Sequence, residues 1–381
     1  MSAAATAAAS IDAFGFDLYG KVATTGTNLV FSPTSIATAL AMAEAGARGE
    51  TATQMDAVLH VGSSAAGNLG FGSLDQALAA LSGRFRDAGG GEHEVALRIA
   101  NAPFAQSGMH IEQPYLDALA AQYGAGLRLV DYRNDPAGAC KLIDDWVGQQ
   151  TEGRIPKLLD SLDSQTRLVL TNAIYLKAAW QTPFSDKETA VADFTRLDGT
   201  KVSVPTMHDA SERSYAAGAG WQAVELPYIG GSLALTIVVP DDMAAFQKNL
   251  DAARFATITS ALKTAMVDLS LPRFKTETKT DLADVLAGLG MPLAMNPDRA
   301  DFSGITSDER LFVSRVVHQA NIAVDEKGTE ASAATAVVMT AGMAPGSPVS
   351  LRVDRPFIFA LRDTRTGAIL FLGRIADPSA A

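Results

Sequence analysis

Residues 316–338 place a strand pattern, a turn and a long run of small residues in direct succession, and this succession restricts what the chain can fold into. Ile322 and Val324 alternate with smaller or more polar residues, and this alternation predicts a strand. The residues Asp-Glu-Lys-Gly at 325–328 are typical of a turn and should end that strand. From Thr329 to Ala341 the chain then holds no Pro, Gly or aromatic residue, and its only charge is Glu330.

The run of small residues has two interpretations. The first is an Ala-rich surface helix, because Ala is the best helix former. Such a helix normally carries charges on its solvent side, and this one has none after Glu330. The second interpretation, which we favour, is a strand held in reserve that could enter a β-sheet without burying an ion. Counted by twos, one face of this strand holds six uncharged residues: Thr329, Ala331, Ala333, Thr335, Val337 and Met339.

Composition argues against several classes of protein. The formal net charge of −11 argues against a nucleic-acid partner. The single cysteine, Cys140, excludes an internal disulfide, and its helical surroundings favour a packed thiol over a nucleophile. No apolar run is long enough to span a membrane, so we expect no membrane partner.

Residues 1–10 lack the basic start and apolar core of a signal peptide. We therefore expect a cytoplasmic protein, or an extracellular one if a signal peptide was removed beforehand. No Pro/Ser/Gly-rich linker or charge block divides the chain, which predicts one domain over residues 1–381.

Enzyme and metal-site signatures are missing from the sequence. There is no Gly-x-Ser-x-Gly elbow, no Walker loop and no His-Glu-x-x-His. The histidines have no metal-ligand spacing, and on local sequence alone each is a structural or surface residue: His60, His93, His110, His208 and His318. We expect no catalytic residue, no metal and no cofactor.

Local patterns predict the main elements. Ser32-Pro33 begins a helix that is apolar nearly all round and should therefore be buried. Residues 167–180 form a mostly apolar strand, as expected at the centre of a sheet. Residues 74–85 have helical spacing after a Gly/Ser-rich loop at 62–72, and residues 268–275 are expected to form a single strand.

Several motifs together resemble one family. The stretch 324–331, Val-Asp-Glu-Lys-Gly-Thr-Glu-Ala, closely resembles the hinge of the serpins, serine protease inhibitors that trap a protease by inserting their own loop into a sheet. Five further stretches are similar to serpin signatures: 31–36, 46–51, 171–180, 301–305 and 371–375. The resemblance implies an α/β serpin fold with one large mixed sheet, two smaller sheets and about eight or nine helices. It also implies an exposed reactive-centre loop at about residues 328–349.

The resemblance also assigns roles to residues within this fold. The hinge would comprise Glu326, Gly328, Thr329, Ala331, Ser332, Ala333 and Ala334. The shutter, where the central strands must part, would be a closed polar network of Ser32, Ser35, Asn172 and His318. The breach, at the opening of the sheet, would hold Trp180 with an Arg273–Glu326 pair that can be bidentate. The alternative for the shutter is a satisfied core network with no switching role.

The scissile bond is expected at Met343-Ala344, with Gly342 or Ala341 as alternatives. The usual family spacing from the hinge glutamate leads to Gly342, and counting back from Pro356 leads to the neighbourhood of Pro345. Gly offers a specificity pocket no side chain, whereas Met343 is flexible and apolar.

As an inhibitory serpin, the chain would act as a monomer on a serine protease of elastase-, chymotrypsin- or subtilisin-like specificity. Trypsin-like targets are disfavoured because no Lys or Arg lies near the expected scissile bond. Heparin is not expected as a partner, since only Arg84 and Arg86 stand where heparin-binding serpins carry a basic face. The alternative is a serpin that no longer inhibits and acts as a carrier or chaperone.

Overall fold

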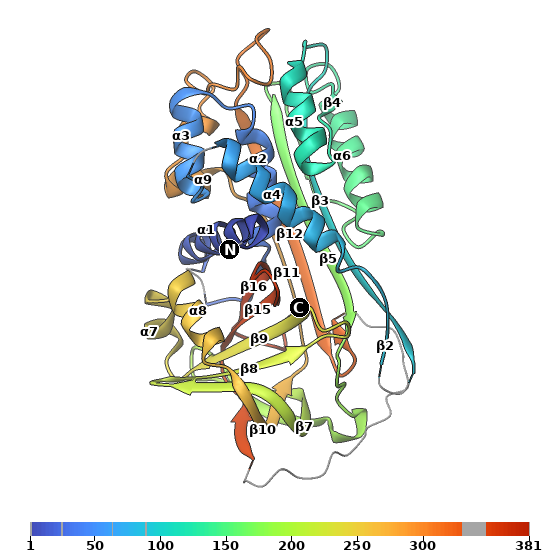
Figure 1. Ribbon diagram of the computed structural model, residues 1–381, viewed down its shortest axis with the longest axis vertical. Coiled ribbons are helices and arrows are strands. Elements are labelled where there is room, and N and C mark those ends of the chain that lie inside the picture. Colours follow the sequence, from blue (N-terminus) through green and yellow to red (C-terminus); the bar gives the residue numbers. More distant parts are fainter. Residues whose placement is uncertain (1, 24–25, 63, 88–89, 330–347, 381) are drawn as a thin grey trace.

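The computed structural model describes residues 2–23, 26–62, 64–87, 90–329 and 348–380, which form an elongated body (Figure 1). This described part contains nine α-helices, in agreement with the eight or nine expected. They are α1 (Ala3–Val22), α2 (Pro33–Glu44), α3 (Gly49–Val58), α4 (Ser64–Ala79), α5 (Gln113–Tyr123), α6 (Pro136–Gln150), α7 (Met243–Lys248), α8 (Ala252–Ser260) and α9 (Ala283–Leu289). None of these helices is long and apolar enough to cross a membrane.

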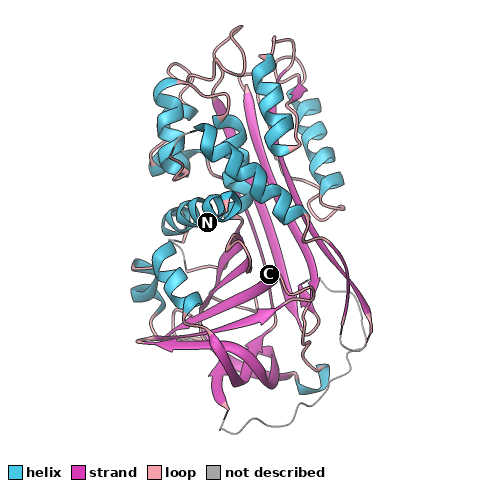
Figure 2. Ribbon diagram, in the orientation of Figure 1, coloured by secondary structure: helices cyan, strands magenta, loops and turns pink. Residues whose placement is uncertain are grey.

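The larger strands of one sheet run along the length of the molecule (Figure 2). This seven-stranded sheet has the order β11 (Phe274–Asp281), β12 (Val313–Asp325), β13 (Gly328–Thr329), β5 (Leu168–Ala179), β3 (Glu92–Gln106) and β2 (Gly83–Arg86), with β4 (Arg128–Val130) also paired to β3. Its central strands β5 and β12 are parallel and pair directly at one end, from Leu168 to Ile174 on β5. At the other end the two-residue strand β13 lies between them.

The second sheet has nine strands and lies in the lower part of the view in Figure 2. Its order is β1 (Leu29–Phe31), β16 (Ile369–Ile375), β15 (Phe357–Asp363), β9 (Leu233–Pro240), β8 (Trp221–Pro227), β7 (Lys201–Gly218), β10 (Lys263–Pro272) and β14 (Val349–Arg352), with β6 (Ala190–Thr195) on β7. The long strand β7 pairs β8 near its end, and β6 and β10 along the rest of its length. The two smaller sheets expected from the resemblance are therefore joined through β7.

Two helices cover opposite faces of the central strands. All twelve residues of α2 are buried, as its apolar pattern predicts. Ser32 caps its N-terminus by accepting a hydrogen bond from the Ser35 backbone N–H. On the other face, Ile143 and Val147 of α6 pack in a cluster with residues of β3, β5 and β12. The centre of the large sheet is therefore buried on both sides.

The predicted loop at residues 62–72 and helix at 74–85 are wrong in their boundaries. Helix α4 already begins at Ser64 and ends at Ala79, and Gly83–Arg86 forms strand β2. Two of the glycines that suggested a loop, Gly70 and Gly72, serve close packing instead. A Cβ added at Gly72 would lie 2.2 Å from the carbonyl oxygen of Gln122, and one at Gly70 would lie 3.3 Å from the Ala7 side chain.

The single strand predicted at 268–275 is in fact two strands in different sheets. Strand β10 ends at Pro272 in the nine-stranded sheet, and β11 begins at Phe274 in the seven-stranded sheet. Arg273 is the one residue between them, and its backbone N–H donates to the carbonyl of Pro205. Arg273 is thereby fixed at the junction of the two sheets.

Candidate functional site

The turn between β12 and β13 is held by the side chain of Asp325, and it requires glycine at position 328. The Asp325 carboxylate accepts hydrogen bonds from the backbone N–H groups of Lys327 (2.8 Å) and Gly328 (3.2 Å). Gly328 has φ 148°, and a Cβ there would lie 2.1 Å from the carbonyl oxygen of Ala178. The chain can therefore enter the sheet at this point only because residue 328 has no side chain.

Thr329 lies inside the sheet. It pairs with Val324 of β12 on one side and Ala178 of β5 on the other, and only 1% of its surface is exposed. Its hydroxyl lies 2.5 Å from the hydroxyl of the buried Tyr228. Because a buried hydroxyl needs a partner, this hydrogen bond stabilises Thr329 in its inserted position.

Trp180 joins the end of β5 to the hinge turn. Its indole N–H donates to the carbonyl of Asp325 (2.8 Å), and its backbone N–H donates to that of Lys327 (2.9 Å). The indole also stacks on Tyr228, with ring centroids 4.4 Å apart. Trp180 was assigned to this region from the sequence, but Tyr228 was not. Tyr228 is distant in sequence from the hinge, and nothing in the local pattern points to its role.

Glu326, which the resemblance assigned to the breach, is a buried charge at the turn between β12 and β13. Its Oε1 accepts hydrogen bonds from Arg273 Nε (2.7 Å) and from the hydroxyl of Thr189 (2.5 Å), and it lies 2.5 Å from Arg273 Nη2. The two nitrogens of Arg273 therefore meet one carboxylate oxygen rather than both. This differs from the two-oxygen fork that an arginine–carboxylate pair can form.

The environment of Glu326 favours its ionised form. Burial by itself would raise the pKa of the Glu326 carboxyl, but the hydrogen bonds from Arg273 and Thr189 outweigh burial and lower this pKa. The glutamate is nearly fully buried, whereas the Arg273 side chain is 43% exposed. The pair is thus neither a surface ion pair nor a fully buried one. Removal of the Arg273 side chain should leave a buried carboxylate that keeps the hydrogen bond from Thr189 but has lost its cation.

The expected shutter residues lie where β5 and β12 pair directly. Asn172 and His318 are direct partners across the two strands, and both are fully buried. His318 Nε2 accepts a hydrogen bond from the backbone N–H of Ser32 (3.0 Å), so this imidazole is neutral. Burial lowers the pKa of His318 to about 3, opposed in part by a hydrogen bond with the backbone of Asn172.

The structure does not close the four expected residues into one network. The Ser35 hydroxyl donates to the side-chain carbonyl of Asn101 (2.6 Å), a residue absent from the sequence prediction. Both polar atoms of the Asn172 amide are buried and have no hydrogen-bond partner in the described part of the chain. Asn101 is the direct partner of Asn172 on β3, so Asn101, Asn172 and His318 form one row across three strands.

The remaining predicted residues of the loop lie outside the described residues. They are the hinge residues Ala331, Ser332, Ala333 and Ala334 and the scissile-bond candidates Ala341, Gly342, Met343 and Ala344. Beyond them, β14 pairs in parallel with β10 from Val349 to Arg352, which fixes the chain on the far side of the loop.

Comparison with known proteins decides the family. A sequence model described as serpin (serine protease inhibitor) matches residues 9–378. The chain is a serpin. It is 40% identical to an uncharacterised serpin-like protein of Thermococcus kodakarensis, over 97% of this chain and 85% of that one. It is 35% identical to the leukocyte elastase inhibitor A of Rattus norvegicus, over 92% of this chain and 93% of that one.

The fold of this serpin is also that of solved structures. Human thyroxine-binding globulin, crystallised with thyroxine, matches with a TM-score of 0.88 at 27% identity, over 99% of this chain and all of that one. The matched proteins thus include an elastase inhibitor and a thyroxine-binding protein. Within the described residues, no group of three or more His, Cys, Asp and Glu side chains could hold a metal ion. Cys140 is half-buried, and burial raises the pKa of its thiol.

The buried neutral His318 predicts a specific pH dependence of stability. As the pH falls below the usual pKa of 6.5, the unfolded imidazole takes up a proton that the folded one does not accept until about pH 3. Between these values the folded state loses about 1.4 kcal/mol of stability per pH unit from this group. His318→Gln should lack this contribution. We expect its melting temperature to fall less than that of the natural protein between about pH 7 and about pH 5.

The control for this measurement is His110→Gln, because His110 is exposed. Its pH profile should follow that of the natural protein. Parallel profiles for the natural protein and His318→Gln would contradict a buried neutral imidazole at His318.

Proposed function

We propose that this serpin inhibits a serine protease by letting its loop be cut and then inserting residues 329–340 between β5 and β12. The proposal rests on the pairing of strand β13, because its two residues, Gly328 and Thr329, already pair with both β5 and β12. The target protease would attack the carbonyl of Met343 and form an acyl-enzyme. Insertion would then carry the tethered enzyme along the sheet and distort its active site before the ester is hydrolysed.

The register of β13 supports this insertion. Strand β5 has twelve residues, and the proposed inserting segment 329–340 also has twelve. Continuing the antiparallel pairing from Thr329 and Ala178 brings Glu330 opposite Lys177, which is only half-buried. The one charge of the segment would then meet a lysine near the surface, while the uncharged face enters the core.

In the same register, the inserted segment would bring a hydroxyl group next to the row formed by Asn101, Asn172 and His318. Counting from the Thr329 pairs on β5 and on β12, Thr335 comes opposite both Asn172 and His318. The Asn172 amide lacks a hydrogen-bond partner in the described chain, and a threonine hydroxyl can both donate and accept. Insertion would therefore supply a partner to a buried amide that the native arrangement leaves unpaired.

The energy of insertion is large enough to drive such a process. About ten new backbone hydrogen bonds at about 1 kcal/mol each, with Val337 and Met339 buried at about 1.5–3 kcal/mol apiece, give on the order of 10 kcal/mol. The native state would then be metastable with respect to the inserted one.

The alternative is a non-inhibitory carrier, and one matched structure is thyroxine-binding globulin in complex with thyroxine. The hinge composition favours inhibition. Residues 329–341 contain no Pro and no large charged residue except Glu330, which falls on the outward face. The 35% identity to a leukocyte elastase inhibitor over nearly the whole chain supports the same conclusion.

The residues around the expected scissile bond favour proteases with small or apolar specificity pockets. Residues 330–347 contain no Lys or Arg, which disfavours trypsin-like enzymes, whereas elastase-, chymotrypsin- and subtilisin-like enzymes accept Met or Ala.

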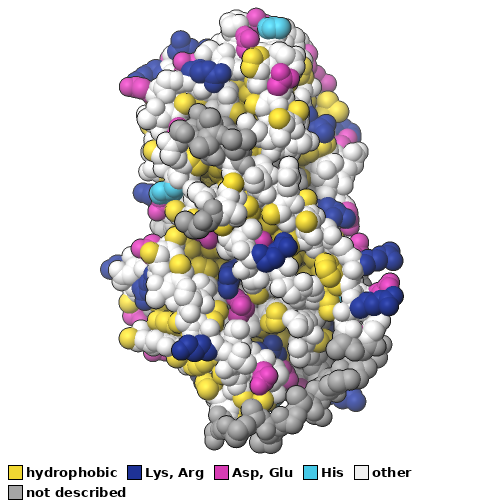
Figure 3. Space-filling model, in the orientation of Figure 1, with side chains coloured by type: hydrophobic (Ala, Val, Ile, Leu, Met, Phe, Trp, Pro, Cys, Tyr) yellow, Lys and Arg dark blue, Asp and Glu magenta, His cyan; other side chains and the backbone are white. Residues whose placement is uncertain are grey.

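A polyanion activator such as heparin is not proposed. On the face shown in Figure 3, Lys and Arg side chains are scattered among Asp and Glu, and Arg86 of β2 is paired with Glu92.

The first experiment is incubation of the intact protein with elastase, chymotrypsin, subtilisin and trypsin. We expect a complex that survives SDS with at least one of the first three, because acyl-enzyme trapping leaves an ester bond intact. Mass analysis of the released peptide should place the cut after Met343, or after Gly342 or Ala341. Complete turnover by every enzyme in the panel would rule out inhibition by this route.

Thr329→Arg should convert the inhibitor into a substrate. Thr329 is 1% exposed, and burying an unpaired guanidinium at this position is costly. We expect insertion to stall while cleavage continues, so that the stoichiometry of inhibition rises by about tenfold. Glu330→Gln is the control, because it alters the outward face of the segment without placing a second cation opposite Lys177 and should change the stoichiometry little. Equal effects of the two substitutions would mean that the inward face of the segment does not enter the core.

Cutting the loop once should make the protein more stable. A stabilisation on the order of 10 kcal/mol would raise the melting temperature by tens of degrees, taking about 2–4 °C per kcal/mol. The comparison of intact and nicked protein should use matched scan rates, because serpin unfolding can be irreversible. Nicked Thr335→Val should gain less than the nicked natural protein, since it leaves Asn172 without a hydroxyl partner. An unchanged or lower melting temperature after the nick would contradict insertion.

A further inference from the structure

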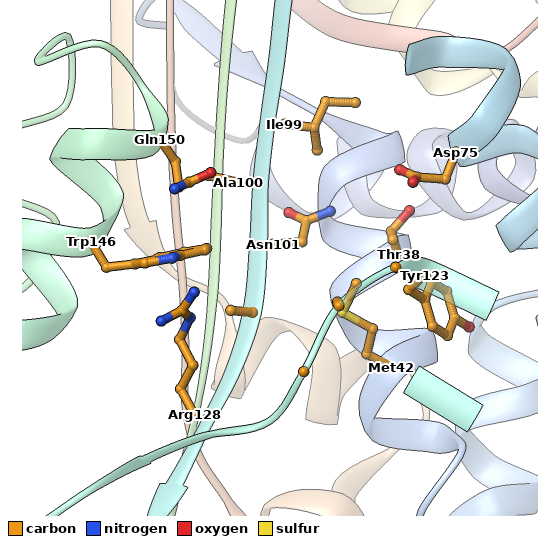
Figure 4. A pocket seen from close by; sticks show the side chains of 14 residues that line it. Thr38, Met42, Asp75, Ile99, Ala100, Asn101, Tyr123, Arg128, Trp146 and Gln150 are labelled. Atoms are coloured by element: carbon orange, nitrogen blue, oxygen red, sulfur yellow. The ribbon is translucent and has the colours of Figure 1, made fainter. Parts of the chain in front are cut away.

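A cavity of about 270 Å³ opens where strand β3 has a free outer edge (Figure 4). Strand β2 pairs with β3 up to Val95, and β4 pairs with it only from Phe104. Between these two residues no described strand covers that edge. The cavity is lined there by residues 99–102, and on its other side by the Gly124–Gly126 turn that follows α5.

Two buried donors line this cavity without a hydrogen-bond partner. They are the side-chain amide nitrogen of Asn101 and the indole nitrogen of Trp146, and no described residue accepts a hydrogen bond from either. The carbonyl oxygen of the Asn101 amide is already engaged by Ser35. Buried donors in folded proteins nearly always have an acceptor. Two unpaired donors beside one cavity therefore indicate a bound group with acceptor atoms.

Two unpaired charged residues also line the cavity. Arg128 is an exposed residue whose guanidinium lies 4.8 Å from the centroid of the Trp146 ring, and it has no ion pair among the described residues. Asp75 of α4 is half-buried and has no hydrogen bond or ion pair in the described chain, and its burial raises the pKa of its carboxyl. In Figure 4, Arg128 and Trp146 lie on one side of β3, and Asp75 and Thr38 lie on the other. The cavity thus passes around the edge of β3, with a cation at one end and a carboxyl at the other.

We propose that this cavity binds a short dipolar molecule, with its carboxylate at Arg128 and Trp146 and its ammonium at Asp75. The two charged ends of the ligand must be separated by several bonds, because Arg128 and Asp75 lie on opposite sides of β3. Ala100, Ala102 and Ile99 offer small and apolar contacts to the connecting chain. A cavity of about 150 Å³ holds benzene, so 270 Å³ holds about ten non-hydrogen atoms. An ω-amino acid has this size and charge arrangement.

The test is calorimetric titration of the intact protein with 6-aminohexanoate, hexanoate and hexylamine. Each end group forms a charge-assisted interaction, so 6-aminohexanoate should bind at least about tenfold more tightly than either singly charged probe. Shorter and longer ω-amino acids should bind more weakly than the best-fitting member of the series. This measurement needs no protease, so its failure would leave the inhibitory function untouched.

Arg128→Ala and Asp75→Asn assign the binding to this cavity. Each should weaken the binding of 6-aminohexanoate by about tenfold and remove its advantage over one singly charged probe. The matched controls are Arg84→Ala on β2 and Asp284→Asn on α9, both exposed and outside the cavity, and they should bind as the natural protein does. Absence of binding by every probe up to about 10 mM, equal binding of hexanoate and 6-aminohexanoate, or indifference to Arg128→Ala would overturn the proposal.

Discussion

The central strands β5 and β12 pair directly along one half of their length and are held apart by β13 at the other, and this fork governs the rest of the structure. Two parallel strands that admit a third must diverge, and each backbone group at the point of divergence needs a partner. Gly328 and Thr329 supply those partners at the open end. Trp180, Tyr228 and Asp325 then stabilise the fork by holding the turn and its first inserted residue.

Buried polar side chains have fewer hydrogen-bond partners in the closed half of the fork, where β5 pairs directly with β12, than in the open half. At the open end, Thr329 has its hydroxyl partner, and Glu326 has two donors. At the closed end, the Asn172 amide is buried between β3 and β12 without a partner in the described chain. An unsatisfied buried amide weakens the state that contains it. The direct pairing of β5 with β12 is therefore the part of the native sheet that a new strand would most readily replace.

The burial of helix α2 and the proximity of Glu326, Arg273 and Trp180 were predicted on different grounds. Helix α2 followed from physics, because Ser32-Pro33 is a helix start and an all-round apolar pattern requires burial. The assignments of Glu326, Trp180 and Arg273 followed only from resemblance, because contacts between β12, β5 and the β10–β11 junction leave no local pattern. Tyr228, Thr189 and Asn101 were missed for the same reason.

The errors in element boundaries have equally specific causes. Gly70 and Gly72 of α4 resemble loop residues until the neighbouring helices are in place, because only then does close contact with Ala7 and Gln122 require them. Residues 268–275 look like one strand, since nothing in a strand pattern reveals that the chain changes sheets at Arg273. Local periodicity reports burial and not the identity of the neighbouring strand.

The two ends of the loop explain why a cut would be needed for insertion. Both ends are tied to the same part of the nine-stranded sheet: Glu326 bonds Arg273, the residue after β10, and β14 pairs with β10 itself. Full insertion would carry Thr340 eleven residues beyond Thr329, or about 36 Å along the sheet. The nine residues from there to Val349 span at most about 32 Å when fully extended. The intact loop is thus too short to insert fully while β14 stays paired, and cleavage within 341–344 removes this restriction.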